Sequence, residues 1–114
     1  MKNDSEKSII QQIIDFNEDL NNKTLTIIDV NRLKSIVSSY YYESIEHQLL
    51  SIVKSIIKNH AFIDANKRTG LMTLVFYSNK YNLTIKLNDT EMFDFIQKIA
   101  ASDIDIEQLS NEVF

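Results

Sequence analysis

The chain has 114 residues, of which 44% are apolar and 25% are charged, as expected for one soluble globular domain spanning residues 1–114. It has no cysteine, no proline and one glycine, which excludes disulfides, thiolate metal sites and turn-rich β architectures. The net charge of −4 argues against a protein that coats nucleic acid. No signal core and no membrane-length apolar run are apparent, so we expect a cytoplasmic protein without a membrane partner.

The first part of the chain predicts two helices. Ile9, Ile13 and Phe16 recur at helical spacing, and Ser5 is suited to cap that helix. The short, β-branched segment 24–28 predicts an extended connection. A second helix follows, with Asp29 as its cap and the apolar residues Val30, Leu33, Ile36, Val37, Tyr40 and Tyr41.

Two strongly apolar helices are predicted in the middle of the chain. The first has a clean amphipathic pattern, with a polar face opposite its apolar one. The stretch from Asn66 to Tyr77 is apolar nearly all round, which predicts a helix buried at the centre of a bundle. The apolar positions of the amphipathic helix are Ile45, Leu49, Ile52, Val53, Ile56 and Ile57.

The remainder predicts two further helices after an extended connection over 81–87. Asn88 or Asp89 is suited to cap the first, and Asp105 the second. The apolar residues of the first of these helices are Met92, Phe93, Phe95, Ile96 and Ile99. The fold class is therefore all-α: a compact bundle of about six helices with a central buried helix and a short extended segment.

A polar segment, 59–70, separates the two apolar helices in the middle of the chain. Within nine residues it carries an imidazole, a carboxylate, an amide, an ammonium and a guanidinium, on His60, Asp64, Asn66, Lys67 and Arg68. Because both flanking helices belong to the core, these polar groups should line the mouth of a pocket.

These residue types suit phosphoryl or nucleotidyl transfer. A helix that begins near Asn66 directs free N–H groups at the turn and attracts an anion, and cations in its first turn suggest the same. Asp64 can share a magnesium ion with bound phosphates. His60 can accept a proton from an attacking hydroxyl.

Each residue alone has a simpler explanation. His60 can neutralise the carbonyls at a helix end, Asp64 can be an ordinary turn residue, and the cations can form a solvated pair. His60 and Asp64 also have the spacing of a metal pair, but without a third ligand a zinc site is disfavoured. The coincidence of all these groups in one short segment favours a functional site.

The sequence HAFIDANKR, from His60 to Arg68, resembles the HxFx(D/E)(G/A)N(K/G)R signature of the Fic/Doc superfamily at every fixed position. The resemblance implies an all-α fold that uses ATP and Mg²⁺ to modify protein hydroxyls. It implies His60 as general base, Asp64 as magnesium ligand and Phe62 as an apolar anchor of the turn. It also implies nucleotide-phosphate contacts from Ala65, Asn66, Lys67 and Arg68.

The combination of Ala65, Lys67 and Leu71 is similar to the Doc branch, the kinase toxin of the Phd/Doc pair. Nucleotide-transferring Fic proteins usually have Gly at position 65 and an arginine at position 71. The resemblance thus implies transfer of the γ-phosphate of ATP to a Ser or Thr of a protein such as elongation factor Tu, with a Phd-type antitoxin as partner and no direct nucleic-acid partner. Two alternatives stay open: a Fic-type AMP transferase, and a catalytically silent module that binds phosphate or a partner.

Two further family features depend on the chain outside the motif. The flap that docks a target peptide in this family should fall near Thr24, Leu25, Thr26 and Ile27. The nearest match to the family's autoinhibitory element, SYYYES, ends in Ser44 in place of Gly or Asn, so we expect no self-inhibition.

Overall fold

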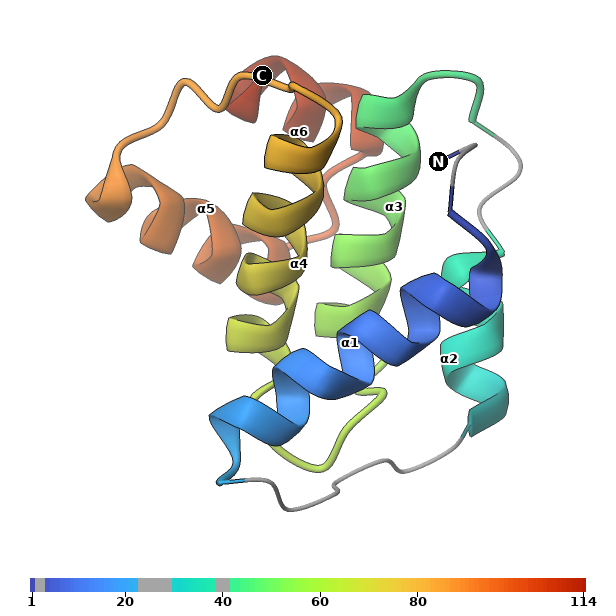
Figure 1. Cartoon of the computed structure of the whole chain (residues 1–114). Coiled ribbons are helices and arrows are strands. Elements are labelled where there is room, and N and C mark those ends of the chain that lie inside the picture. The colour runs from blue at the N-terminus through green and yellow to red at the C-terminus, as the bar shows by residue number, and fades with distance from the viewer. Residues whose placement is uncertain (2–3, 23–29, 39–41) are drawn as a thin grey trace.

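The computed structural model describes residues 1, 4–22, 30–38 and 42–114. Over these ranges the chain forms six helices and no strand, which confirms the predicted all-α fold (Figure 1). The helices are α1 (Glu6–Leu20), α2 (Val30–Val37), α3 (Ile45–Lys58), α4 (Asn66–Lys80), α5 (Asp89–Ala101) and α6 (Ile106–Val113).

Side-chain caps fix where several helices begin. The Ser5 side chain accepts a hydrogen bond from the backbone N–H of Ser8 at the start of α1, and Asp105 accepts one from Gln108 at the start of α6. Asn88 and Glu91 form a reciprocal capping box at the start of α5. All three caps were predicted from the sequence.

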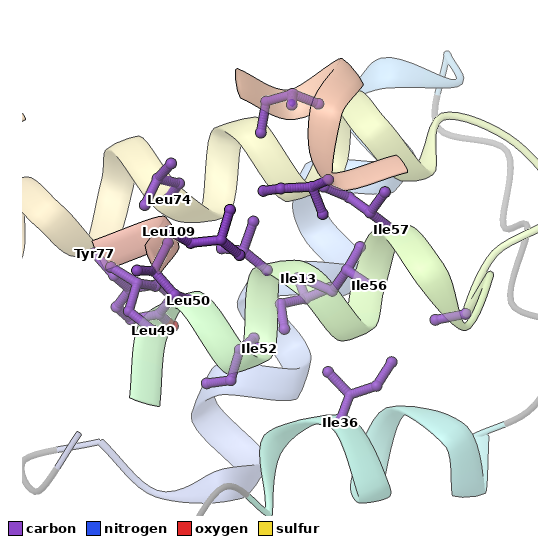
Figure 2. Close-up of a cluster of buried hydrophobic side chains, with 14 of the residues drawn as sticks. Ile13, Ile36, Leu49, Leu50, Ile52, Ile56, Ile57, Leu74, Tyr77 and Leu109 are labelled. Atoms are coloured by element: carbon purple, nitrogen blue, oxygen red, sulfur yellow. The ribbon is translucent and has the colours of Figure 1, made fainter. Parts of the chain in front are cut away.

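Helix α3 is the centre of the bundle. It packs against α2, α4, α5 and α6, while α1 packs against α2 and α4. Figure 2 shows Ile36 of α2, Leu74 of α4 and Leu109 of α6 gathered around α3. The face of α3 that was predicted to be apolar is buried from Leu49 onward, whereas Ile45 is only half-buried. Leu50 is also buried and widens this face.

The prediction that the helix after Asn66 is buried all round is wrong. Val75 and Phe76 of α4 are 41% and 39% exposed, whereas its buried positions include Thr69, Gly70 and Thr73. Leu74 and Tyr77 are buried as predicted, but small side chains share their face because they allow the neighbouring helices to approach closely. Apolar character therefore identified only part of the buried face of α4. The central helix is α3.

The last helices agree with the sequence except at one residue. Phe93 was placed on the apolar face of α5 but is 60% exposed. The segment 81–87, predicted as an extended connection, begins with a turn at Tyr81 and Asn82, where Asn82 is left-handed with φ 58°. The residues after this turn form neither helix nor strand, and the Lys86 N–H donates to the Val113 carbonyl, 2.9 Å away. Helix α2 ends at Val37, earlier than predicted. The predicted cap Asp29, the segment 24–28 and the residues Tyr40 and Tyr41 lie outside the described residues.

None of the described helices has the length and apolar character needed to cross a membrane.

Candidate functional site

The loop that joins α3 to α4 forms one side of a pocket of about 650 Å³, and α5 forms another. Helices α3 and α4 run side by side, with this loop at one end and α1 crossing near it (Figure 1). All the polar residues singled out in the sequence motif line the pocket, while Phe62 is buried in the core at 1% exposure. The lining residues are Ile57, Lys58, His60, Ile63, Asp64, Ala65, Asn66, Lys67, Arg68, Leu71, Phe93, Ile96, Gln97, Ala100 and Ala101.

Two left-handed residues shape the loop. His60 has φ 48°, directly after the C-cap of α3, and Ala65 has φ 62° as the N-cap of α4. Histidine is among the residue types that adopt this region more readily, whereas alanine does so at a cost of about 1 kcal/mol or more. These two positions stand at the two ends of the loop, and both line the pocket.

The side chain of Asn66 holds the loop together internally. Its Oδ1 accepts from the Phe62 N–H at 3.1 Å, and its Nδ2 donates to the Phe62 carbonyl at 2.9 Å. Both amide groups are therefore engaged within the loop. An Asn66 contact with a phosphate would come from its backbone N–H.

Two helices outside the motif also bind the loop. The Asn17 Nδ2 of α1 donates to the Asp64 carbonyl at 2.9 Å, and the Arg32 Nη1 of α2 donates to the Asn59 carbonyl at 3.3 Å. The loop is thus held at its α3 end and at its α4 end by side chains that lie far away in the sequence.

The start of α4 is arranged to attract an anion. The Asp64 Oδ1 accepts from the Ala65 N–H at 2.7 Å. Within the described part of the chain, no acceptor bonds the next three N–H groups, those of Asn66, Lys67 and Arg68. These groups carry the positive end of the helix dipole, which draws negative charge.

Charged side chains strengthen this preference. Lys58, Lys67 and Arg68 line the pocket, and Asp64 is the one acidic side chain among the lining residues. Lys67 is held toward α5 by the Gln97 Oε1 at 3.1 Å. His60 and Arg68 both line the pocket, and within the described ranges neither the imidazole nor the guanidinium has a hydrogen-bond or ion-pair partner.

The donor set suits a magnesium ion that is shared with a nucleotide. No group of three acidic or histidine side chains gathers in the described ranges, as a resident metal would require. Mg²⁺, however, is commonly held by one or two carboxylates together with substrate phosphates. Asp64 lies beside the anion-attracting N–H groups and can supply that single carboxylate.

A model of the Fic/DOC family matches residues 9–78, more than half of the chain. The chain belongs to the Fic/DOC family. This membership supports a Fic-type protein-modifying domain. The Fic/DOC match begins within α1 and ends at residue 78, near the end of α4. Helix α5, which carries Phe93 and Gln97 into the pocket, lies outside the Fic/DOC match. No curated protein matches the chain.

The sequence reasoning missed several residues that line this Fic/DOC pocket or hold its loop in place. Lys58 and Gln97 lie on helices where a polar residue is unremarkable, so nothing distinguished them. Asn17 did leave a signal, because it interrupts the apolar stripe of α1 one turn after Ile13. The predicted flap residues Thr24, Leu25, Thr26 and Ile27 lie outside the described residues.

Proposed function

We propose that this Fic/DOC domain is a Doc-like protein kinase. It transfers the γ-phosphate of ATP to a Ser or Thr hydroxyl of a cytosolic protein such as elongation factor Tu. The observation that carries the proposal is the pocket: a helix N-terminus and three cations surround a space that is also lined by the imidazole of His60. Phosphoryl transfer depends mostly on positioning and charge neutralisation, which such a pocket supplies.

In this reaction His60 acts as general base. It accepts the proton of the target hydroxyl as that oxygen bonds to the γ-phosphorus. The bond between the γ-phosphorus and the β–γ bridging oxygen breaks, and ADP leaves. Lys67, Arg68 and the N–H groups at the start of α4 hold the phosphates and offset the charge that develops on the leaving oxygen.

Asp64 is the proposed magnesium ligand. Asp64 lines the pocket, and its carboxylate lies beside the N–H groups that would hold the phosphates. A bound Mg²⁺, held by this carboxylate, would neutralise part of the charge of the phosphates.

Three residues favour γ-phosphate transfer over AMP transfer. The Ala65 methyl narrows the space over the turn, Lys67 occupies the position that is often Gly in AMP-transferring Fic proteins, and Leu71 lines the pocket where those proteins usually have a second arginine. Without that arginine, the pocket lacks one of the phosphate clamps of the AMP-transfer arrangement. Control by a Phd-type antitoxin belongs to the same proposal.

The position of an isotopic label tests the reaction. Purified protein is incubated with Mg²⁺, elongation factor Tu and ATP labelled either at the α- or at the γ-phosphorus. We expect the target to acquire the γ label only. Transfer of the α label would show that the protein is an AMP transferase and not a kinase.

A variant without the imidazole separates enzyme from binding module. His60→Ala keeps Lys67 and Arg68, so ATP should still bind while label transfer falls by at least about a hundredfold, as is typical for loss of a general base. If His60→Ala modifies the target as fast as the wild type, His60 is not the base. If the wild type binds ATP and labels no protein, the silent binding module is the better description.

A further inference from the structure

We propose that Asn17 of α1 is a positioning residue for the pocket. Its side-chain amide fixes the Asp64 end of the loop and thereby the geometry of the carboxylate and of the N–H groups at the start of α4. This inference rests on the proposed function for its consequence in ligand binding. The contacts that carry it lie outside the sequence motif.

The environment of Asn17 is unusual for an asparagine. It is 1% exposed and lies on the face of α1 that otherwise buries Ile9, Ile13 and Phe16. Burying an amide costs free energy unless its hydrogen bonds are made, and an apolar side chain would suit this position without that cost. A requirement other than core packing therefore explains an amide here.

The hydrogen bonds of Asn17 show what that requirement is. Its Nδ2 donates to the Asp64 carbonyl at 2.9 Å and to the Thr69 hydroxyl at 3.1 Å. One amide thus joins three parts of the molecule: helix α1, the end of the loop and the first turns of α4. Because a carbonyl only accepts, the contact with Asp64 requires a donor at position 17.

The amide of Asn17 is itself held in place. Asn21, one turn along α1, donates its Nδ2 to the Asn17 backbone carbonyl at 2.9 Å and to the Asn17 Oδ1 at 3.2 Å. The second bond occupies the Asn17 oxygen and leaves the Asn17 nitrogen facing the loop. Asn21 thus holds the amide of Asn17, and Asn17 in turn holds the Asp64 carbonyl.

Fixing the Asp64 backbone fixes two functional groups at once. The Asp64 side chain bonds the Ala65 N–H, and the next residues provide the N–H groups for an anion. A loop held in its binding geometry before the ligand arrives loses less entropy on binding. Loss of the Asn17 donor should therefore weaken anion binding. A substitution elsewhere in the core that lowers the free energy of unfolding by the same amount should weaken it less.

The test compares two buried substitutions on the same helix. Asn17→Leu removes the donor and keeps the size, while Ile13→Val removes one methyl group from the core one turn away. The affinity for ATP with Mg²⁺ is measured by calorimetry, well below each melting temperature. We expect Asn17→Leu to bind about tenfold more weakly than the wild type and Ile13→Val to bind as the wild type does.

A second readout does not depend on ATP. Amide hydrogen exchange is followed for residues 62–68 in the same proteins, and we expect faster exchange there in Asn17→Leu than in Ile13→Val. Asn17→Asp provides the same comparison with a side chain of nearly equal shape that lacks the donor when ionised.

The outcomes separate the two proposals. If the wild type binds ATP and Asn17→Leu and Asn17→Asp bind equally well, Asn17 does not position the pocket. If the wild type does not bind ATP, the proposed function fails, and the exchange rates then decide on Asn17 alone. Unchanged exchange over 62–68 in both Asn17 variants overturns the inference.

Discussion

At the residue scale, Ala65 is constrained both by its backbone conformation and by the space around its side chain. It is the N-cap of α4 with a left-handed backbone, and it is 8% exposed. Alanine has the smallest side chain with a Cβ, so it limits both the backbone strain and the space that is taken from the pocket.

Ala65→Val should therefore lower the free energy of unfolding by about 2 kcal/mol, because a β-branched side chain is strained in this region and crowds a packed site. Ala65→Gly relieves the strain but adds unfolded-state entropy and loses a methyl contact, so it should stay within about 1 kcal/mol of the wild type. Urea denaturation measures both. A valine variant as stable as the glycine variant would contradict the left-handed conformation.

Lys58 provides a prediction about charge. It is the last residue of α3 and lines the pocket, so it should contribute to anion binding although it lies outside the motif. Lys58→Met should weaken the affinity for ATP with Mg²⁺ by about three- to tenfold at low salt, and less at high salt.

Lys34→Met is the matched control for Lys58→Met. Lys34 is exposed on α2, and the substitution makes the same change in net charge away from the lining of the pocket. Equal effects of the two substitutions would indicate a response to net charge and not to the pocket.

At the element scale, the crossing of α3 and α4 depends on Gly70. A Cβ at this position would lie 2.9 Å from the Ile57 Cγ1 and 3.0 Å from its Cδ1, closer than packed carbon atoms normally approach. The one glycine of the chain therefore serves helix packing.

Gly70→Ala should destabilise the protein by about 1–2 kcal/mol, because overpacking outweighs the gain in helix propensity of about 1 kcal/mol. In an Ile57→Ala background the same substitution should cost less, because the clashing atoms are gone. Denaturation of the two single variants and the double variant measures this coupling. Additive effects would show that Gly70 and Ile57 are not in close contact.

The helices whose faces follow a simple pattern were predictable. Apolar spacing and a serine cap identified α1, and the same spacing identified α3. The buried face of α4 was only partly predictable. Its buried residues Leu74 and Tyr77 are apolar, but Thr69, Gly70 and Thr73 pack closely through small size and not through hydrophobicity.

The residues of the candidate site were likewise predictable only in part. The motif residues in the loop were predictable because they are close in sequence, and the structure brings them to one pocket. Asn17 and Gln97 lie on helices far from the loop in the sequence, and only the packing of these helices shows that Asn17 bonds the loop and that Gln97 lines the pocket. Lys58 directly precedes the loop, but a polar residue at the end of an amphipathic helix did not indicate that it lines the pocket. Phe93 is exposed at the pocket because its neighbours Met92, Phe95 and Ile96 fill the buried face of α5.

At the scale of the whole molecule, Asp4 ties the beginning of the chain to the end of α4. Its carboxylate accepts from the Lys80 ammonium at 2.5 Å and from the Tyr81 hydroxyl. Burial alone would raise the pKa of Asp4, but these hydrogen bonds and the charge of Lys80 outweigh it, so the pKa of Asp4 lies below its usual value of 3.8. Burial and the bond to Asp4 raise the pKa of Tyr81 above its usual value of 10.0.

A lowered carboxyl pKa stabilises the fold above pH 3.8 and ceases to do so as the pH falls through the folded-state pKa. Asp4→Asn should therefore cost about 1.5 kcal/mol at neutral pH, and the difference from the wild type should disappear in strong acid. The raised pKa of Tyr81 stabilises below pH 10 and is lost at higher pH. Denaturation across the pH range checks both, and a difference that persists undiminished in strong acid would contradict the prediction for Asp4.

The central claim is that the loop between α3 and α4 holds phosphate groups beside His60. Titration of the isotope-labelled protein with ATP and Mg²⁺, followed through its backbone amide resonances, tests this claim most directly. We predict saturable shifts at residues 65–68 and at His60, which Arg68→Ala should weaken strongly. Saturable shifts confined to other helices, with the amides of residues 65–68 unmoved, would contradict it.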